Sequence, residues 1–325
     1  MRPAVKIAIS VLSGFILASY LFWELPLISR NANEIIIKIP KEEKTAKEVL
    51  SQLHKERILK HPKLFRLTLS LFRWDKKIQR GTYKLRKNEA WPTLIRKLTR
   101  GETYGIKVTI PEGWRAEQIA ERLEALGVSD AKGFLEIVHR ENSEGFLFPS
   151  TYFLEPNLPA SEAIGILRSS FDRAWQENFL TKNPPMRFTK RDVIILASII
   201  ERETTVKEEK PIIAGVYLNR LQKNWRLEAD PTVQYALGYW KNKTTYQDLK
   251  IKSPYNTYQR YGLPIGPISN PGLESIAAVF DPTQTNYMYF IAKGDGTHTF
   301  LETLKEHNRE KALKKRAKRA RLKAL

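Results

Sequence analysis

The residues best suited to acid–base chemistry in this chain follow an apolar segment. Residues 193–200 read Val-Ile-Ile-Leu-Ala-Ser-Ile-Ile, and Glu201, Arg202 and Glu203 come directly after them. Burial against apolar neighbours disfavours the charged form of a carboxyl group and so raises its pKa. Such a carboxyl can donate a proton and then take one back near neutral pH. We therefore take Glu201 as the candidate general acid and base.

Helical spacing separates the two glutamates. On a helix, Glu201 shares a face with Ala197 and Ser198, whose small side chains are expected to leave room for a ligand. Glu203 lies about 200° around the helix, on the face expected to be packed. This position makes Glu203 a candidate hydrogen-bond partner behind the acid, with Ser198 a candidate substrate neighbour.

The charge at position 201 also has a structural interpretation. A glutamate at the end of an apolar helix can be a surface charge, or it can form a buried ion pair, here with Arg202 or Arg220. The loops downstream favour the chemical interpretation, because they are dense in the amide, hydroxyl and aromatic groups that bind carbohydrate.

These loops contribute the other candidate site residues. They are Asp230, Thr232, Tyr255, Asn256, Tyr258, Asn270 and His298. Asp230 precedes a proline, which favours a helix N-cap over a second catalytic carboxylate. His298 can be either a substrate contact or a packed histidine.

Composition limits the other possibilities. The chain has no cysteine, which excludes disulfides, thiol nucleophiles and thiolate metal sites. The histidines lack metal-ligand spacing and no phosphate-binding glycine loop is present, so no metal and no cofactor are expected. A net charge of +20 favours a polyanionic partner, such as nucleic acid, anionic lipid or an acidic wall polymer.

The N-terminal segment predicts a membrane anchor. Residues 7–23 carry no charge and as a helix would cover about 26 Å, close to the ~30 Å of a bilayer core. Arg2 and Lys6 precede this run, which predicts that residues 1–6 lie in the cytoplasm and that the chain after residue 23 lies outside the cell membrane. A cleaved signal peptide is the alternative, but no small-residue cleavage pattern follows. An exported chain argues against nucleic acid as the partner.

The remaining segments predict an α+β fold. Residues 145–156 are rich in aromatic side chains and indicate a buried strand or hairpin, or an aromatic platform for a sugar. Thr189 and Asp192 have capping-box spacing, which predicts where the helix that carries Glu201 begins. The C-terminal residues 309–325 form a basic tail. The expected strands are 34–40, 81–85 and one at about 108–111, and the expected helices are 45–53, 91–98, 116–123, 160–178 and one after Thr189.

The motifs taken together resemble those of the endolytic murein transglycosylase family, the YceG-like proteins. The matching segments occur in family order over about residues 80–308. They are 196–204, 216–221, 230–233, 255–258, 262–264, 268–272 and 298–300.

This resemblance implies a membrane-anchored enzyme that cuts within peptidoglycan glycan strands, leaves 1,6-anhydro-muramoyl ends and thereby ends strand elongation. It implies a LysM-like module at 34–105, a catalytic domain at 106–308 and proximity to penicillin-binding synthases. The family's catalytic glutamate maps onto Glu201.

One carboxyl group suffices for such a reaction. Hydrolytic glycosidases generally use two carboxyls. Here the C6 hydroxyl of the same muramoyl sugar attacks, so positioning replaces an activated water. Glu201 would protonate the bridging oxygen and then accept the proton of the C6 hydroxyl. A membrane-anchored glycan-binding or scaffold protein without turnover is the alternative function.

Overall fold

The computed structural model describes most of the chain. The described residues are 34–39, 45–79, 81–101, 104–239, 241 and 244–323. The expected anchor at residues 7–23 lies outside them. Among the helices that are described, none combines the length and the apolar character needed to cross a bilayer.

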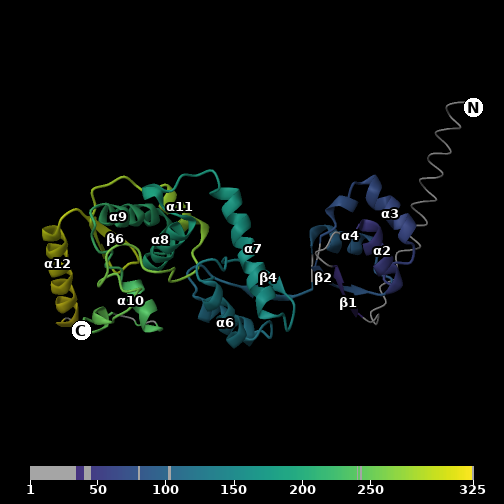
Figure 1. Cartoon of the computed structure of the whole chain (residues 1–325), viewed down its shortest axis with the longest axis horizontal. Coiled ribbons are helices and arrows are strands. Elements are labelled where there is room, and N and C mark those ends of the chain that lie inside the picture. Colours follow the sequence, from purple (N-terminus) through teal and green to yellow (C-terminus); the bar gives the residue numbers. More distant parts are fainter. Residues whose placement is uncertain are drawn as a thin grey trace, which may run out of the picture. The chain divides into compact units, whose positions relative to one another are not determined.

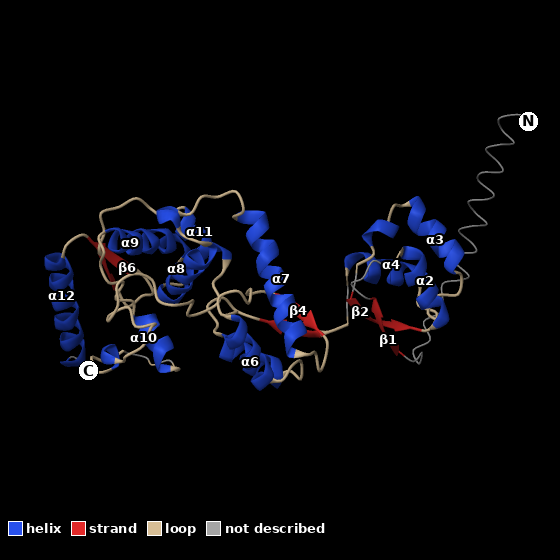
Figure 2. Cartoon of the chain, in the orientation of Figure 1, coloured by secondary structure: helices blue, strands red, loops and turns tan. Residues whose placement is uncertain are grey.

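Helices and small sheets alternate along the described chain, which confirms the mixed α+β fold (Figure 1, Figure 2). Each sheet in this part of the chain has two strands: β1 with β2, β3 with β4, and β5 with β6. The chain divides into two compact units. The first comprises residues up to 106 together with 153–155, and the second comprises 107–152 and the chain from 156 onward.

The first unit is built on an antiparallel strand pair. β1 (Glu34–Ile39) pairs with β2 (Gly81–Arg86), and Ile37 lies opposite Tyr83. Alternate side chains of a strand point to one face, so Ile37 and Ile39 join Tyr83 in the core. Among its described residues, this unit has the helices α2 (Ala46–Lys55), α3 (Pro62–Leu71) and α4 (Trp91–Arg100), with a 3-10 turn at Asp75–Lys77.

Local signals set the ends of these helices. Pro62 occupies the first position of α3, where its missing N–H costs no hydrogen bond. Gly101 ends α4 in the left-handed region, with φ 69°. The sequence did not predict α3, because Leu67 and Leu71 are exposed and blur its apolar stripe.

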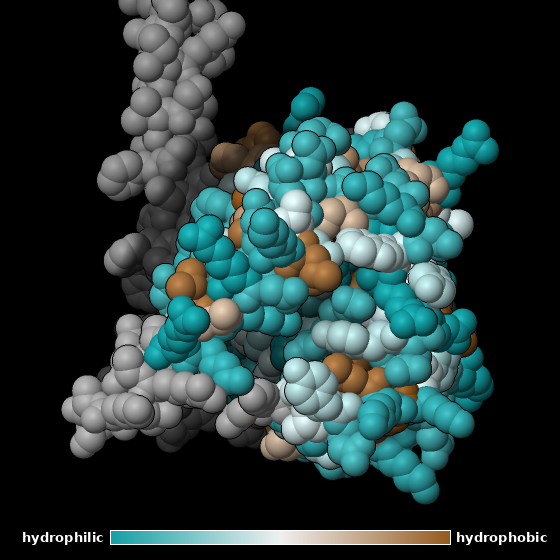
Figure 3. Space-filling model, turned by 90° about the vertical axis from the view of Figure 1, so that its left-hand side faces the viewer, coloured by the Kyte–Doolittle hydropathy of each residue, from teal (hydrophilic) through white to brown (hydrophobic). Residues whose placement is uncertain are grey.

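The rest of the chain is mainly helical. Short 3-10 turns lie at Pro185–Arg187, Lys207–Glu209 and Asp248–Lys250. The face at the α12 end is mostly hydrophilic, with apolar residues in small separate patches (Figure 3). The elements in chain order are β3 (Ile106–Thr109), α5 (Ala116–Ala125), α6 (Ala131–Glu141), β4 (Thr151–Leu154), α7 (Ala160–Asn178), α8 (Lys190–Glu203), α9 (Lys210–Gln222), α10 (Asp230–Leu237), α11 (Leu273–Phe280), β5 (Tyr289–Ala292), β6 (His298–Leu301) and α12 (Leu304–Lys323).

Helix α8 lies in the core of the second unit. Its first turn has the predicted capping box: the Asp192 N–H donates to Thr189 Oγ at 3.2 Å, and the Thr189 N–H donates to Asp192 Oδ2 at 2.9 Å. All residues from Val193 to Ile200 are buried, as expected of a helix that is apolar on every side. Helices α9 and α11 pack against it. The helix ends at Glu203, so both candidate glutamates lie where the buried helix reaches polar surroundings.

Candidate active site

Glu201 lies in a buried ion pair. Lys210, the first residue of α9, donates to both carboxylate oxygens at 3.1 and 3.3 Å. The Gly272 N–H and the Ser275 hydroxyl donate to Oε2 at 2.9 and 2.7 Å. The side chains of Lys210 and Glu201 are 3% and 7% exposed. The cation that hydrogen-bonds to Glu201 is a lysine, which the sequence analysis did not consider.

The side of α8 next to Glu201 has no room for a ligand. Ala197 and Ser198 are fully buried. The Ser198 hydroxyl donates to the Ile195 carbonyl at 2.7 Å and accepts from the Ile268 N–H at 3.0 Å. The predicted space is therefore filled by the loop that carries Ile268, and Ser198 fastens this loop to the helix. This part of the prediction was wrong, because helical spacing does not reveal which distant segment packs on a face.

Glu203 has different surroundings. The Tyr217 hydroxyl donates to Oε1 at 2.5 Å, and Oε2 has no partner among the described residues. Burial raises the pKa of Glu203 to about 7; the charge of Asp230 adds to this rise, and the Tyr217 hydrogen bond and Arg220 oppose it. Such a carboxyl is about half protonated at neutral pH, as a group that both gives and takes a proton requires.

Two more polar groups lie in the same region. Asp230 is the first residue of α10 and accepts from the Tyr258 hydroxyl at 2.6 Å. Burial, and then this hydrogen bond to Asp230, raise the pKa of Tyr258. Ala229 is the N-cap of α10, so the predicted cap lies one residue earlier than expected. We call Glu203, Tyr217, Asp230 and Tyr258 the Glu203 cluster.

Three of the candidate site residues are fully buried. Thr232, Asn256 and Asn270 have no exposed surface. Asn256 donates from Nδ2 to the carbonyls of Leu249 and Ile251 at 3.0 and 2.8 Å. The polar groups of all three residues form hydrogen bonds with other parts of the protein. Gly, Pro and Asn motifs predict a turn but not which way its side chains point.

Glu144 is a buried carboxyl that the sequence reasoning missed. Its Oε1 accepts from Asn270 Nδ2 at 2.8 Å, and its Oε2 accepts from the Ala116 N–H at 3.1 Å and the Tyr235 hydroxyl at 3.4 Å. Burial raises the pKa of Glu144 to about 7, although the hydrogen bond from Ala116 lowers it. Glu144 lies in the turn between α6 and the aromatic-rich segment 145–156, and its sequence context does not distinguish it from the exposed Glu141 nearby.

Tyr255 and His298 are both packed against the protein. The Tyr255 ring lies 4.7 Å from that of Tyr235. His298 contacts Glu209 through its ring Nδ1 at 2.7 Å and donates its backbone N–H to the same carboxylate at 2.7 Å. Of the two interpretations of His298, the structure favours the packed histidine. Within the described residues no group of acidic and histidine side chains could hold a metal ion.

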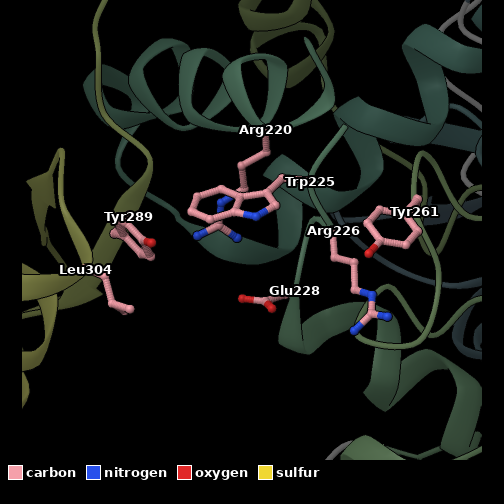
Figure 4. Close-up of a pocket in the computed structure, with 7 residues that line it drawn as sticks. All are labelled: Arg220, Trp225, Arg226, Glu228, Tyr261, Tyr289 and Leu304. Atoms are coloured by element: carbon pink, nitrogen blue, oxygen red, sulfur yellow. The ribbon is translucent and has the colours of Figure 1, made fainter. Parts of the chain in front are cut away.

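A pocket of about 270 Å³ is lined by residues close in the chain to the Glu203 cluster: Arg220 lies one helical turn after Tyr217 on α9, and Glu228 lies two residues before Asp230 (Figure 4). Arg220 connects the two, since it lines the pocket and its charge lowers the pKa of Glu203. The sequence analysis did not identify the loop between α9 and α10 as part of a site. The pocket is lined by Arg220, Trp225, Arg226, Glu228, Tyr261, Tyr289 and Leu304.

Comparison with known proteins gives consistent matches. The model of the YceG-like family matches residues 37–313. The chain is 33% identical over 290 residues to the endolytic murein transglycosylase of Bacillus subtilis (strain 168), and the match covers 81% of this chain and 80% of that protein. It is 25% identical to the endolytic murein transglycosylase of Streptococcus pneumoniae serotype 2 (strain D39 / NCTC 7466), over 89% of this chain and 60% of that protein.

A solved structure is also similar. A crystal structure of a YceG-like protein from Listeria monocytogenes aligns with a TM-score of 0.55 and 29% identity. The alignment covers 86% of this chain and 99% of that one. The likeness therefore extends over both sequence and fold.

Proposed function

This chain belongs to the YceG-like family and acts on peptidoglycan as an endolytic transglycosylase, and we propose that Glu203 is the acid and base of its reaction. One observation carries this assignment. Both oxygens of Glu201 accept hydrogen bonds from protein donors, whereas Oε2 of Glu203 has no partner in the described part of the chain. Of these two glutamates, Glu203 is therefore the one with an oxygen that no protein donor occupies and that can hold and transfer a proton.

The reaction needs no second carboxyl. Protonated Glu203 donates its proton to the oxygen that links the muramoyl sugar to the next sugar, and the C1–O bond breaks. The C6 hydroxyl of the muramoyl sugar then bonds to C1, which closes the 1,6-anhydro ring, and its proton passes to Glu203. The carboxyl returns to its starting form and no water is consumed, because the nucleophile is already part of the substrate.

The other members of the Glu203 cluster support this step. Tyr217 holds Oε1 and so leaves Oε2 as the oxygen that carries the proton. Asp230 brings negative charge to the site, held by the Tyr258 hydroxyl. Such a charge stabilises the positive charge that develops on the sugar ring as the glycosidic bond breaks.

Paired glutamine variants test the assignment. Glu203→Gln keeps the size of the side chain but removes the transferable proton, so release of anhydro-muramoyl ends should fall by about 10²- to 10⁴-fold. Glu201→Gln weakens the ion pair with Lys210, so it should lower the melting temperature while activity persists in the folded protein. Mass spectrometry of the sugar ends released from purified wall measures both.

The opposite pattern has a clear meaning. Loss of activity in Glu201→Gln, with activity retained in Glu203→Gln, would return the catalytic role to Glu201, as the sequence predicted. Full activity in both variants would favour a glycan-binding protein whose acid is structural.

We also propose that residues 7–23 anchor the enzyme in the cell membrane, with residues 1–6 in the cytoplasm and the catalytic domain outside. The charge-free run and its flanking basic residues support this proposal. The strand–helix–helix–strand order of β1, α2, α3 and β2 supports a LysM-like module at 34–105. Removal of residues 1–23 should release the chain from membranes on fractionation. Co-purification of the anchored chain with a penicillin-binding synthase tests the partner that the resemblance suggests.

A further inference from the structure

The pocket lined by Arg226 and Glu228 contains side chains of both charges, whereas a glycan strand without peptide stems offers mainly hydroxyl and amide groups. We propose that it binds the peptide stem of the muramoyl sugar at the cleavage site, with a stem carboxylate on Arg226 and a stem amino group on Glu228. This inference rests on the proposed function, because the stem is attached to the sugar whose bond is broken. Murein stems are short peptides that contain free carboxylates together with an amino group, so a pocket with both charges is complementary to them.

Arg226 is available for a ligand. It is exposed, and no ion pair occupies it among the described residues. Its guanidinium lies over the ring of Tyr261, 4.9 Å from the centroid. Stacking on a ring orients the planar guanidinium, which then presents paired N–H donors to a carboxylate. Figure 4 shows this pair on one side of the pocket and the Glu228 carboxylate beside it.

Apolar side chains complete the pocket. Trp225 is 44% exposed, Tyr261 is 58% exposed and Leu304 is 55% exposed. Trp225 lies edge-on to Tyr289, with ring centroids 5.7 Å apart. Large apolar side chains that are exposed together, rather than singly, indicate a contact surface. Here they would cover the aliphatic part of the stem.

The backbone of the loop between α9 and α10 is held in an unfavourable conformation. Asn224 and Glu228 have φ of 52° and 50°, and the left-handed region is uncommon for a residue such as glutamate. The Trp225 N–H donates to the Arg220 carbonyl at 2.7 Å, and the Glu228 N–H donates to the Thr257 carbonyl at 3.3 Å. Strain that the surrounding structure maintains is concentrated at functional sites. This loop delivers Trp225, Arg226 and Glu228 to the pocket.

The position of the pocket fits the chemistry. Arg220 lines the pocket and lies one helical turn after Tyr217 on α9, and the Tyr217 hydroxyl donates to Glu203, so the same stretch of α9 serves the pocket and the proposed acid. The stem branches from the same muramoyl sugar that receives the proton. Arg220 itself is buried and donates from Nε to the Met288 carbonyl at 2.8 Å. Its removal would disturb the fold, so Arg226 is the better residue for a test.

The test compares two forms of one substrate. Purified glycan strands with peptide stems are matched with the same strands after an amidase has removed the stems, and kcat/KM for the release of anhydro ends is measured on each. The wild type should prefer the stem-bearing strands. Arg226→Ala should lower the ratio of the two values about tenfold, the effect of one charge-assisted hydrogen bond, and Arg226→Lys should lower it less. Arg173→Ala, at an exposed position of α7, is the matched control and should leave the ratio unchanged.

Two outcomes would overturn the inference. Arg226→Ala could leave kcat/KM unchanged on both substrates, or it could lower kcat/KM by the same factor on both. In either case the ratio keeps its wild-type value. The second result would make the pocket an ordinary sugar subsite. Acetylation of the stem amino groups adds an independent arm: it should weaken the preference of the wild type but not that of Glu228→Gln.

A binding measurement separates this inference from the proposed function. Glu203→Gln is titrated by calorimetry with a muramoyl disaccharide that carries a tetrapeptide and with the same disaccharide without it. Binding at least tenfold tighter of the peptide form, lost in Glu203→Gln/Arg226→Ala, supports the stem pocket. Equal binding of the two forms overturns it. Absence of anhydro ends from the wild type on both strand types would instead contradict the proposed function.

Discussion

The hydroxyl of Tyr217, on α9, donates a 2.5 Å hydrogen bond to Oε1 of Glu203, at the end of α8. Tyr217 is fully buried, so its ring has no alternative position and α9 determines where the carboxyl lies. Two residues earlier, Glu201 receives Lys210 from the first turn of the same helix. One helix thus supplies a neutral donor to one glutamate and an ammonium to the other, which separates their chemistry.

The pH dependence of the reaction should follow Glu203. Its pKa is raised to about 7, so its proton-donating form declines as the pH rises through that value. Initial rates of anhydro-end release should therefore fall above about pH 7. Tyr217→Phe removes a hydrogen bond that lowers this pKa, so the decline should move to higher pH and the maximal rate should drop. An unchanged profile in Tyr217→Phe would argue that another group donates the proton.

The ion pair between Lys210 and Glu201 should be a major contributor to stability. Lys210→Met leaves a buried carboxylate without its cation, which typically costs about 3–5 kcal/mol in the free energy of unfolding. Urea denaturation measures this cost. Lys210→Met/Glu201→Gln should recover part of it, because the uncompensated charge is gone. Lys223→Met, at an exposed position just after α9, is the control and should be nearly neutral; an equal loss there would contradict the assignment.

Glu144 should make the fold less stable as the pH rises. Its pKa is about 7 in the folded protein against 4.5 as the ordinary value, so the folded state binds the proton more tightly than the unfolded state. That advantage is complete below about pH 4.5 and is lost as the pH rises through about 7. The loss for one such group is about 3 kcal/mol.

Melting temperatures measured across this pH range test whether the stability of the fold falls as the pH rises. Glu203 has a pKa raised to about the same value, so both groups contribute to the slope of melting temperature against pH. Glu144→Gln should remove about half of it, and Glu144→Gln/Glu203→Gln should remove most of it. A slope that persists in the double variant would locate the titrating group elsewhere.

Asn256 should matter for stability rather than for substrate affinity. Asn256→Ala leaves the Ile251 carbonyl without this donor and removes one of the two side-chain donors to the Leu249 carbonyl, which should cost about 2 kcal/mol. The KM for glycan strands should stay at the wild-type value at temperatures where the variant is folded. A raised KM with unchanged stability would support the substrate contact that the sequence predicted.

The features that the sequence determined by itself are local ones. The capping box of Thr189 and Asp192 predicted the start of α8, and the expected strands 34–40 and 81–85 correspond to β1 and β2. Each depends on residues a few positions apart, so short-range geometry is sufficient to recognise it. The order of the motifs also identified the family, because the order and spacing of motifs along a chain can be recognised without the structure.

The tertiary structure alone decided the surroundings of the two glutamates. Glu201 and Glu203 have the same side chain and the same apolar helix before them. Lys210 and Tyr217 come from α9, and Ser275 comes from α11, more than seventy residues downstream. The protonation of a carboxyl depends on its burial and on the donors within hydrogen-bond distance. Neither quantity exists until distant segments have packed together, which is why the sequence predicted Glu201 as the acid, whereas burial in the folded protein raises the pKa of Glu203.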